Sequence, residues 1–193
     1  MKTCARRSIG LVVIAVVALA SSADAGVRDE WSRLRRPLHL PRVPSGAACP
    51  VSRVDHRVQW RRHRFPGSPG IGRGPVYPGL THPGWLYATR GRPSGGPWFG
   101  AKVFWYVLPS YPGPVLIRGR RLDGAEWVRF NGGRLPAPEL RIAPGDTVSW
   151  EGGAPGSRGR PSAVRVKEPG CYAFQIDGMT FSRVVVFVAD LAR

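Results

Sequence analysis

The chain is predicted to fold as an all-β protein, an antiparallel β-sandwich preceded by an irregular arm. Three observations support this fold class. From residue 101 onward, short runs rich in β-branched and aromatic residues recur at close spacing. Pro-Gly, Asp-Gly and Asn-Gly turn signals separate these runs, and no run carries a convincing helical period. Many short strands separated by turns are typical of a sandwich or barrel.

The first 25 residues are predicted to be an export signal. A short basic start precedes an apolar run at residues 9–20, and Ala23-Asp24-Ala25 offers small residues to a signal peptidase. The run is shorter than the roughly 20 apolar residues that a membrane span needs. Cleavage after Ala25 would leave a secreted, extracytoplasmic protein without a transmembrane segment. The alternatives are an uncleaved anchor or a buried helix.

Residues 26–98 form the predicted arm, which is rich in proline, glycine and arginine. Proline and glycine recur every few residues, which disfavours long helices and central strands. One helical turn is expected near Trp31 and Leu34, followed by an extended stretch from Pro37 to Pro41. The region has too many aromatic and aliphatic side chains for a disordered tail. We therefore expect an ordered arm packed on a sandwich domain at residues 99–193.

The first strand of that domain is expected at Ala101–Leu108. Its alternate side chains are apolar on both faces, so both faces should be covered by other parts of the protein. The two faces carry Val103, Trp105 and Val107 on one side and Phe104, Tyr106 and Leu108 on the other. Further strands are expected at Pro114–Arg118, Glu126–Phe130, Glu139–Ile142, Asp146–Glu151, Ala163–Lys167, Cys171–Ile176 and Phe181–Val188.

The last two strands are expected to form a hairpin that turns at residues 177–180. In the first of them, Tyr172, Phe174 and Ile176 share one face, which we assign to the main core, and Cys171 lies on the opposite face. We place Phe187 of the second strand on the same face as Cys171. The arm would then cover Phe187.

Two cysteines remain after removal of the signal, Cys49 and Cys171. An even pair in an oxidising compartment predicts one structural disulfide. Such a bond closes a loop of about 123 residues, for which chain-entropy estimates reach roughly 4–5 kcal/mol. The alternative is a pair of buried thiols.

The chain is strongly basic, with a formal net charge of +17. Without the signal, 26 basic and 11 acidic residues remain, a net charge of +15. Such a charge attracts polyanions, which outside the cytoplasm include wall glycopolymers, anionic lipids and released nucleic acid. A GC-rich genome would account for the excess of arginine over lysine, 24 to 2 in the mature chain, but not for the few acidic residues.

The densest basic cluster runs from Arg53 to Arg64 and includes Arg57 and Trp60. Arginine and aromatic side chains together bind phosphate backbones and stack on rings. A solvated loop with an Arg–Trp contact is the alternative. The candidate polyanion-binding residues are Arg61, Arg62, Arg64, Arg118, Arg120, Arg121 and Trp60. Trp85 is a further candidate for stacking on a sugar or base.

The segment from Pro169 to Ser182 resembles the C-terminal hairpin of immunoglobulin-like bacterial modules, in which Pro-Gly-x-Tyr precedes a strand. More closely, the chain resembles an uncharacterised family of exported proteins from high-GC bacteria. The shared segments are Trp31 with Arg36–Pro41, Cys49-Pro50 and Pro114–Arg120. The resemblance spans most of the mature chain. It implies a β-sandwich and an exported location, and it brings no assigned activity.

No metal or cofactor site and no catalytic residue are predicted. All four histidines lie in the arm, and no histidine separates Cys171 from Met179, so only a cupredoxin-like sandwich without copper would fit. There is no Gly-x-Ser-x-Gly motif. Asp123 and Asp177 each precede glycine, which indicates turns.

The sequence therefore favours an exported, non-enzymatic sandwich protein of the cell envelope or medium. Its partners would be anionic cell-wall polymers or another envelope protein, without specific nucleic-acid binding. The alternative is a small exported hydrolase acting on cell-wall polysaccharide, with Glu126 and Glu151 as the first carboxylates to test. A third hypothesis is a purely structural protein whose charge reflects genome composition.

Overall fold

The computed structural model describes residues 30–44, 46–61, 65, 67–90, 97–131, 135–146, 153 and 155–192. The predicted signal at residues 1–25 lies outside the described residues, as does most of the strand expected at Asp146–Glu151. The chain divides into two compact units, residues 1–35 and 36–193. In the first unit, residues 30–34 form the single helical turn expected from the sequence.

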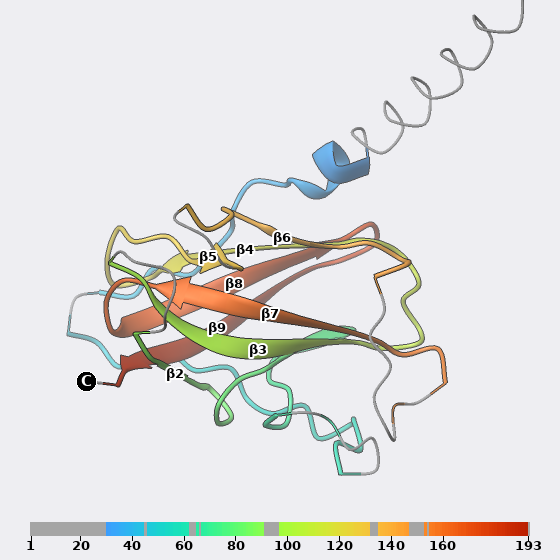
Figure 1. Ribbon diagram of the computed structural model, residues 1–193, viewed down its shortest axis with the longest axis horizontal. Helices are drawn as coiled ribbons and strands as arrows, with labels where there is room; N and C mark the ends of the chain where they lie inside the picture. The colour runs from blue at the N-terminus through green and yellow to red at the C-terminus, as the bar shows by residue number, and fades with distance from the viewer. Residues whose placement is uncertain are drawn as a thin grey trace, which may run out of the picture. The chain divides into compact units, whose positions relative to one another are not determined.

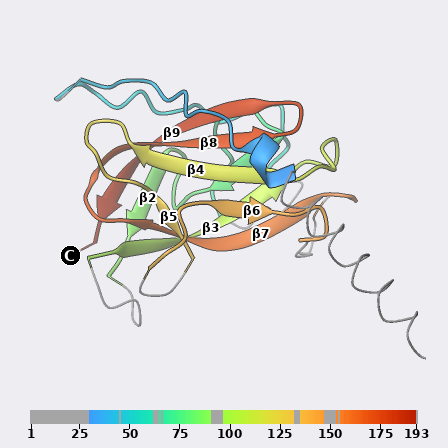
Figure 2. The same ribbon diagram turned by 90° about the horizontal axis from the view of Figure 1, so that it is seen from above.

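The described part of the second unit is a β-sandwich, which confirms the predicted fold class (Figures 1 and 2). One sheet has the strand order β1-β3-β7-β5, and the other has the order β2-β9-β8-β4-β6. The strands are β1 (Val76–Gly79), β2 (Trp85–Ala88), β3 (Phe99–Val107), β4 (Val115–Arg121), β5 (Arg129–Phe130), β6 (Leu140–Ile142), β7 (Arg158–Val166), β8 (Gly170–Gly178) and β9 (Ser182–Leu191).

Two segments of the predicted arm are strands rather than irregular chain. β1 pairs antiparallel with β3, and β2 pairs parallel with β9, the one parallel pairing among these strands. Both lie at the edges of their sheets. Pro78 within β1 has no amide donor, which an edge strand tolerates and a central strand does not. The sequence signal was weak because each strand has four residues and glycine or proline adjoins both.

The core lies between the two sheets, as the alternation of apolar residues predicted. Val103, Trp105 and Val107 of β3 are fully buried there, and the rings of Trp105 and Phe174 are 5.0 Å apart. The indole Nε1 of Trp105 donates to Ser162 Oγ at 2.9 Å, so the buried donor is satisfied. The opposite face of β3 packs on a second aromatic cluster formed with Trp60, Phe65 and Tyr77.

The position predicted for Phe187 is wrong. Phe187 stacks on Phe174 in the main core, with ring centroids 4.4 Å apart. The register pairs Tyr172 with Phe187 and Cys171 with Val188, and directly opposed residues of an antiparallel pair share a face. The outer face therefore carries Val186 beside Cys171.

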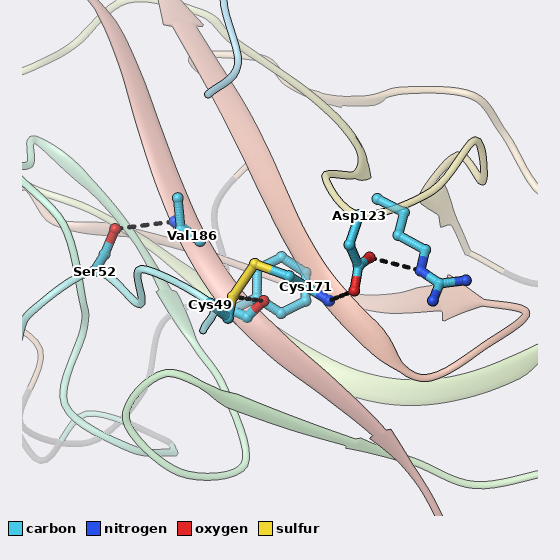
Figure 3. The surroundings of a disulfide bond; sticks show 7 residues. Cys49, Ser52, Asp123, Cys171 and Val186 are labelled. Atoms are coloured by element: carbon cyan, nitrogen blue, oxygen red, sulfur yellow. Dashed lines mark hydrogen bonds and ion pairs between the residues drawn. A yellow bond between two sulfur atoms is a disulfide. The ribbon is translucent and has the colours of Figure 1, made fainter. Parts of the chain in front are cut away.

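The arm crosses that outer face and is bonded to it through a disulfide (Figure 3). Cys49 and Cys171 form the bond predicted from the sequence, with sulfur atoms 2.01 Å apart. Three residues on, the Ser52 amide donates to the Val186 carbonyl at 3.0 Å, and the Val186 amide donates to Ser52 Oγ at 2.9 Å. Asp123 Oδ2 accepts from the Cys171 amide at 3.2 Å, which holds the sheet side of the cross-link.

A buried polar network attaches residues 36–39 of the arm to the same sheet. Asp177 and Gln175 have no solvent exposure. Arg118 Nη2 donates to Asp177 Oδ2 at 2.8 Å and also to the Arg36 carbonyl. Gln175 accepts from the His39 amide at 2.7 Å. Asp177 is therefore a buried strand residue and ion-pair partner, which corrects its interpretation as a turn residue.

The disulfide is expected to stabilise the folded state strongly because it closes a loop with a sequence separation of 122. The double variant Cys49→Ala/Cys171→Ala should lower the free energy of unfolding by about 2–5 kcal/mol. Urea unfolding of the protein without residues 1–25 measures this. Reductant should bring the wild type to the midpoint of the variant and leave the variant unchanged; equal stability of variant and oxidised wild type would contradict the role.

The Asp177 network is predicted to stabilise the folded state independently of the disulfide. Replacing Asp177 with Ala leaves the Arg118 guanidinium buried without its carboxylate, which should cost about 3–5 kcal/mol of unfolding free energy. Asp177→Asn, which keeps the shape, should cost less. The matched control is Asp190→Ala on the neighbouring strand, an exposed position where about 0.5 kcal/mol or less is expected. Equal stabilities of the two alanine variants would contradict the network's importance.

Candidate functional site

Four exposed arginines line one groove between the arm and the start of β9. Arg53 and Arg57 come from the arm, Arg73 precedes β1, and Arg183 is the second residue of β9. The groove has a volume of about 950 Å³. Its remaining lining residues are Ser52, Val54, Asp55, Gly72, Ser182 and Val184.

Two hydrogen bonds bring arginines of this groove together from distant parts of the chain. The Gly72 amide donates to the Arg53 carbonyl at 2.9 Å, so the two arm segments lie side by side. Arg183 Nε donates to the Arg73 carbonyl at 3.2 Å, which ties β9 to the same segment. Gly72 has φ +97°, and a Cβ there would lie 2.8 Å from Val185 Cγ2, so this close approach requires glycine.

Asp55 is the acidic residue of the groove, and its charge is compensated within it. The carboxylate is nearly buried and accepts from Arg57 Nε at 2.8 Å, Arg57 Nη2 at 2.7 Å and Tyr77 Oη at 2.7 Å. The hydrogen bonds from Arg57 hold the pKa of Asp55 well below its usual range, although burial opposes them. Asp55 thus fixes the orientation of Arg57 and stays ionised.

Tyr77 does not supply a base at this site. Burial raises the pKa of its phenol well above the usual value, and the hydrogen bond to Asp55 adds to that effect. At neutral pH the phenol is therefore a donor, and the Asp55 carboxylate is an acceptor. Together they form a fixed support beneath Arg57.

The groove has a net positive charge. Arg57 neutralises Asp55, whereas Arg53, Arg73 and Arg183 form no ion pair within the described part of the chain. Like charges gathered in a concave surface focus the field and concentrate anions there. The geometry therefore suits an anionic ligand with several charged groups.

The predicted candidates in the arm lie in different surroundings. Trp60 is 8% exposed and packs edge-on against Tyr77, with ring centroids 4.9 Å apart. Its ring is therefore buried and has no free face on which a ligand could stack. Its Nε1 donates to the Asp55 carbonyl at 2.9 Å. Arg61 is exposed but does not line the groove, and Arg62 and Arg64 lie outside the described residues.

The three candidates on β4 also differ from one another. Arg118 is largely buried against Asp177, and Arg121 pairs with Asp123 and Glu168. Arg120 is exposed, with its guanidinium 5.7 Å from the Trp127 ring centroid. Two of the three positive charges are therefore compensated by acidic partners, and Arg120 is the one at the surface.

The sequence cluster contained Arg53 and Arg57 but gave no sign of the other half of the groove. Arg73 and Arg183 stand in unremarkable surroundings along the chain, and only the fold brings them to Arg53. A charged loop next to a glycine-rich segment was the available signal. It did not distinguish residues that line the groove from those that do not.

Of the two carboxylates named for a hydrolase, the structure describes Glu126. Glu126 Oε2 lies 3.3 Å from Lys167 Nζ, and Glu151 lies outside the described residues.

Among the residues that the structure describes, no group of three histidine, cysteine or acidic side chains lies close enough to hold a metal. In the same residues, no helix is long and apolar enough to cross a membrane.

Comparisons with known proteins give little beyond the geometry. No protein family matches the chain, and no curated protein is similar to it in sequence. A crystal structure of a Bacillus anthracis protein provisionally described as a lipoprotein is similar over 65% of this chain and 82% of that one. The two share 12% sequence identity and superpose with a TM-score of 0.41.

The Asp55–Arg57 pair predicts a defined dependence of stability on pH. Folding lowers the pKa of Asp55. As the pH falls through about 4, where an unperturbed aspartate titrates, Asp55 therefore takes up a proton in the unfolded chain before it does so in the folded protein. The stabilisation is therefore complete at neutral pH and decreases as the pH falls below that range.

The variant Asp55→Asn tests this dependence by urea unfolding at several pH values. It should be less stable than the wild type at neutral pH, and the difference should narrow in acid. Asp190→Asn, at an exposed aspartate, is the control and should show little difference at any pH. A constant gap between Asp55→Asn and wild type would contradict the ion-pair interpretation.

Proposed function

We propose that the protein is an exported, non-enzymatic binding protein that holds an anionic polymer in the arginine groove. The observation that carries the proposal is the convergence of Arg53, Arg57, Arg73 and Arg183 on one groove that contains a single, already neutralised carboxylate. Guanidinium groups bind phosphate, sulfate and carboxylate oxygens through paired donors, which favours such ligands over neutral ones.

The extent of the groove favours a chain over a single small anion. A second hollow of about 510 Å³ shares Asp55, Arg57, Arg73 and Arg183 with the first and extends to Tyr77. The basic surface is thus longer than one charged group needs. Successive charges of a polymer would meet successive arginines.

The state of the groove's polar residues favours binding over catalysis. The lowered pKa keeps Asp55 ionised and the raised pKa keeps Tyr77 protonated, so neither exchanges a proton near neutral pH.

Export is supported by two independent features. The first is the signal-like sequence at residues 1–25, and the second is the Cys49–Cys171 disulfide, a type of bond that persists in oxidising compartments.

Binding of long-chain inorganic polyphosphate across a salt series tests the groove. The triple variant Arg53→Gln/Arg73→Gln/Arg183→Gln should weaken binding about tenfold or more at low salt and flatten the dependence of log K on log salt, because fewer counterions are displaced. Isothermal titration calorimetry or fluorescence anisotropy of labelled polyphosphate measures both quantities.

The matched control is Arg42→Gln/Arg61→Gln/Arg120→Gln, which removes three positive charges from exposed arginines that do not line the groove. This variant should bind with nearly wild-type affinity. An equal loss in both variants would show that the overall charge, rather than the groove, attracts the polymer. Binding that does not change with salt would refute the proposal.

A further inference from the structure

A second surface, distinct from the groove, carries two exposed aromatic rings on β2. Leu86 and Ala88 point into the core and are fully buried, whereas Trp85 and Tyr87 are 42% and 41% exposed. The two rings are nearly parallel, at 16°, with centroids 6.3 Å apart. The His82 ring packs edge-on against Tyr87 at 5.7 Å and supports it. We call Trp85 and Tyr87 the aromatic strip.

The backbone at the strip offers little to a partner strand. The Trp85 amide donates to the His82 carbonyl at 3.0 Å, and the Tyr87 amide donates to Thr81 Oγ1 at 3.1 Å. The opposite edge of β2 pairs with β9. Strand addition needs free donors along an edge. The strip therefore presents ring surfaces rather than a template for another β-strand.

The side chains beside the strip restrict the charge of its ligand. The parallel register places Trp85 next to Val188 and Tyr87 next to Asp190, on the same face of the sheet. Asp190 is exposed, and its Oδ1 accepts from the Leu191 amide at 2.8 Å. A carboxylate accepts hydrogen bonds from hydroxyl groups and repels phosphate and sulfate. The strip therefore favours a neutral, hydroxyl-rich ligand.

Asp190 also borders a hollow of about 480 Å³ at the end of β9. Phe99 and Leu191 give it apolar walls, and the Arg90 guanidinium lies 5.0 Å from the Phe99 ring centroid. Beyond the strip and its carboxylate, the surface thus has room for a further ring. A chain of linked rings fits this layout better than an isolated one.

We propose that Trp85, Tyr87 and Asp190 form a binding site for neutral sugar units of a polysaccharide. A pyranose ring has an apolar C–H face, which packs on an aromatic ring, and hydroxyl groups around its edge, which reach a carboxylate. Aromatic side chains with one solvent-exposed face suit a ligand that has both an apolar face and polar groups. The site is independent of the arginine groove, which selects charge.

Soluble oligosaccharides of N-acetylglucosamine, glucose and mannose are the probes, titrated into the mature protein by calorimetry. The measurements are made at about 0.5 M NaCl, where the screening length is only a few ångströms and the groove contributes little. At least one oligosaccharide should bind. The variant Trp85→Ala/Tyr87→Ala should weaken that binding about tenfold or more, and Asp190→Asn should weaken it less.

The matched control is Trp127→Ala, which removes another exposed indole, 45% accessible, away from β2. It should leave sugar binding unchanged, as should the triple arginine variant of the groove. Failure of all the oligosaccharides to bind would overturn the proposal, and so would binding that survives Trp85→Ala/Tyr87→Ala. Stronger binding of oligothymidylate than of sugar, lost in the same double variant, would assign the strip to nucleobases instead. If the triple arginine variant loses polyphosphate binding and keeps sugar binding, the result supports two independent sites.

Discussion

The attachment of the arm to the outer face of β8 and β9 is the constraint on which the rest of the structure depends. That face carries Ala173 and Val186, which would be apolar surface in water without the arm. The disulfide fixes one point, and the buried Asp177–Arg118 pair fixes another at Arg36. The two attachments differ in kind, one covalent and one dependent on desolvated charges, so neither replaces the other.

The arginine groove is a consequence of this attachment. One wall comes from the arm and the other from β9, and Ser52, which bonds to Val186, lies at the junction. The arginines of this protein thus have two roles that depend on their partners. Arg118 meets a buried carboxylate and stabilises the fold, whereas Arg73 and Arg183 have no acidic partner among the described residues and give the groove its charge.

The sequence was a good guide where alternation or residue type carried the information. Alternation along β3 identified both of its faces, and the pair of cysteines in a chain with a signal-like start predicted the disulfide. It failed where pairing register or long-range packing decides. Phe187 lies on the face opposite to the predicted one, because the sequence of a single strand does not fix its register against β8. The arginines around Trp60 along the chain predict a ring at the surface, but three aromatic side chains from other parts of the chain bury it.

The two proposed sites lie at opposite ends of one strand, which limits the ligands that could use both. Arg183 stands near the start of β9 and Asp190 near its end, about 23 Å apart at the usual rise of a strand, and their side chains point to opposite faces of β9 because they are an odd number of residues apart. The arginine end favours anions, whereas the hollow at the other end is lined by one cation, Arg90, and one anion, Asp190, and does not favour either sign. A small anion would therefore occupy the groove alone, and a small neutral sugar the strip alone. One ligand that used both sites would need charged groups and uncharged sugar rings in the same polymer, and a length sufficient to pass from one face of β9 to the other; neither polyphosphate nor a neutral glycan carries both kinds of group.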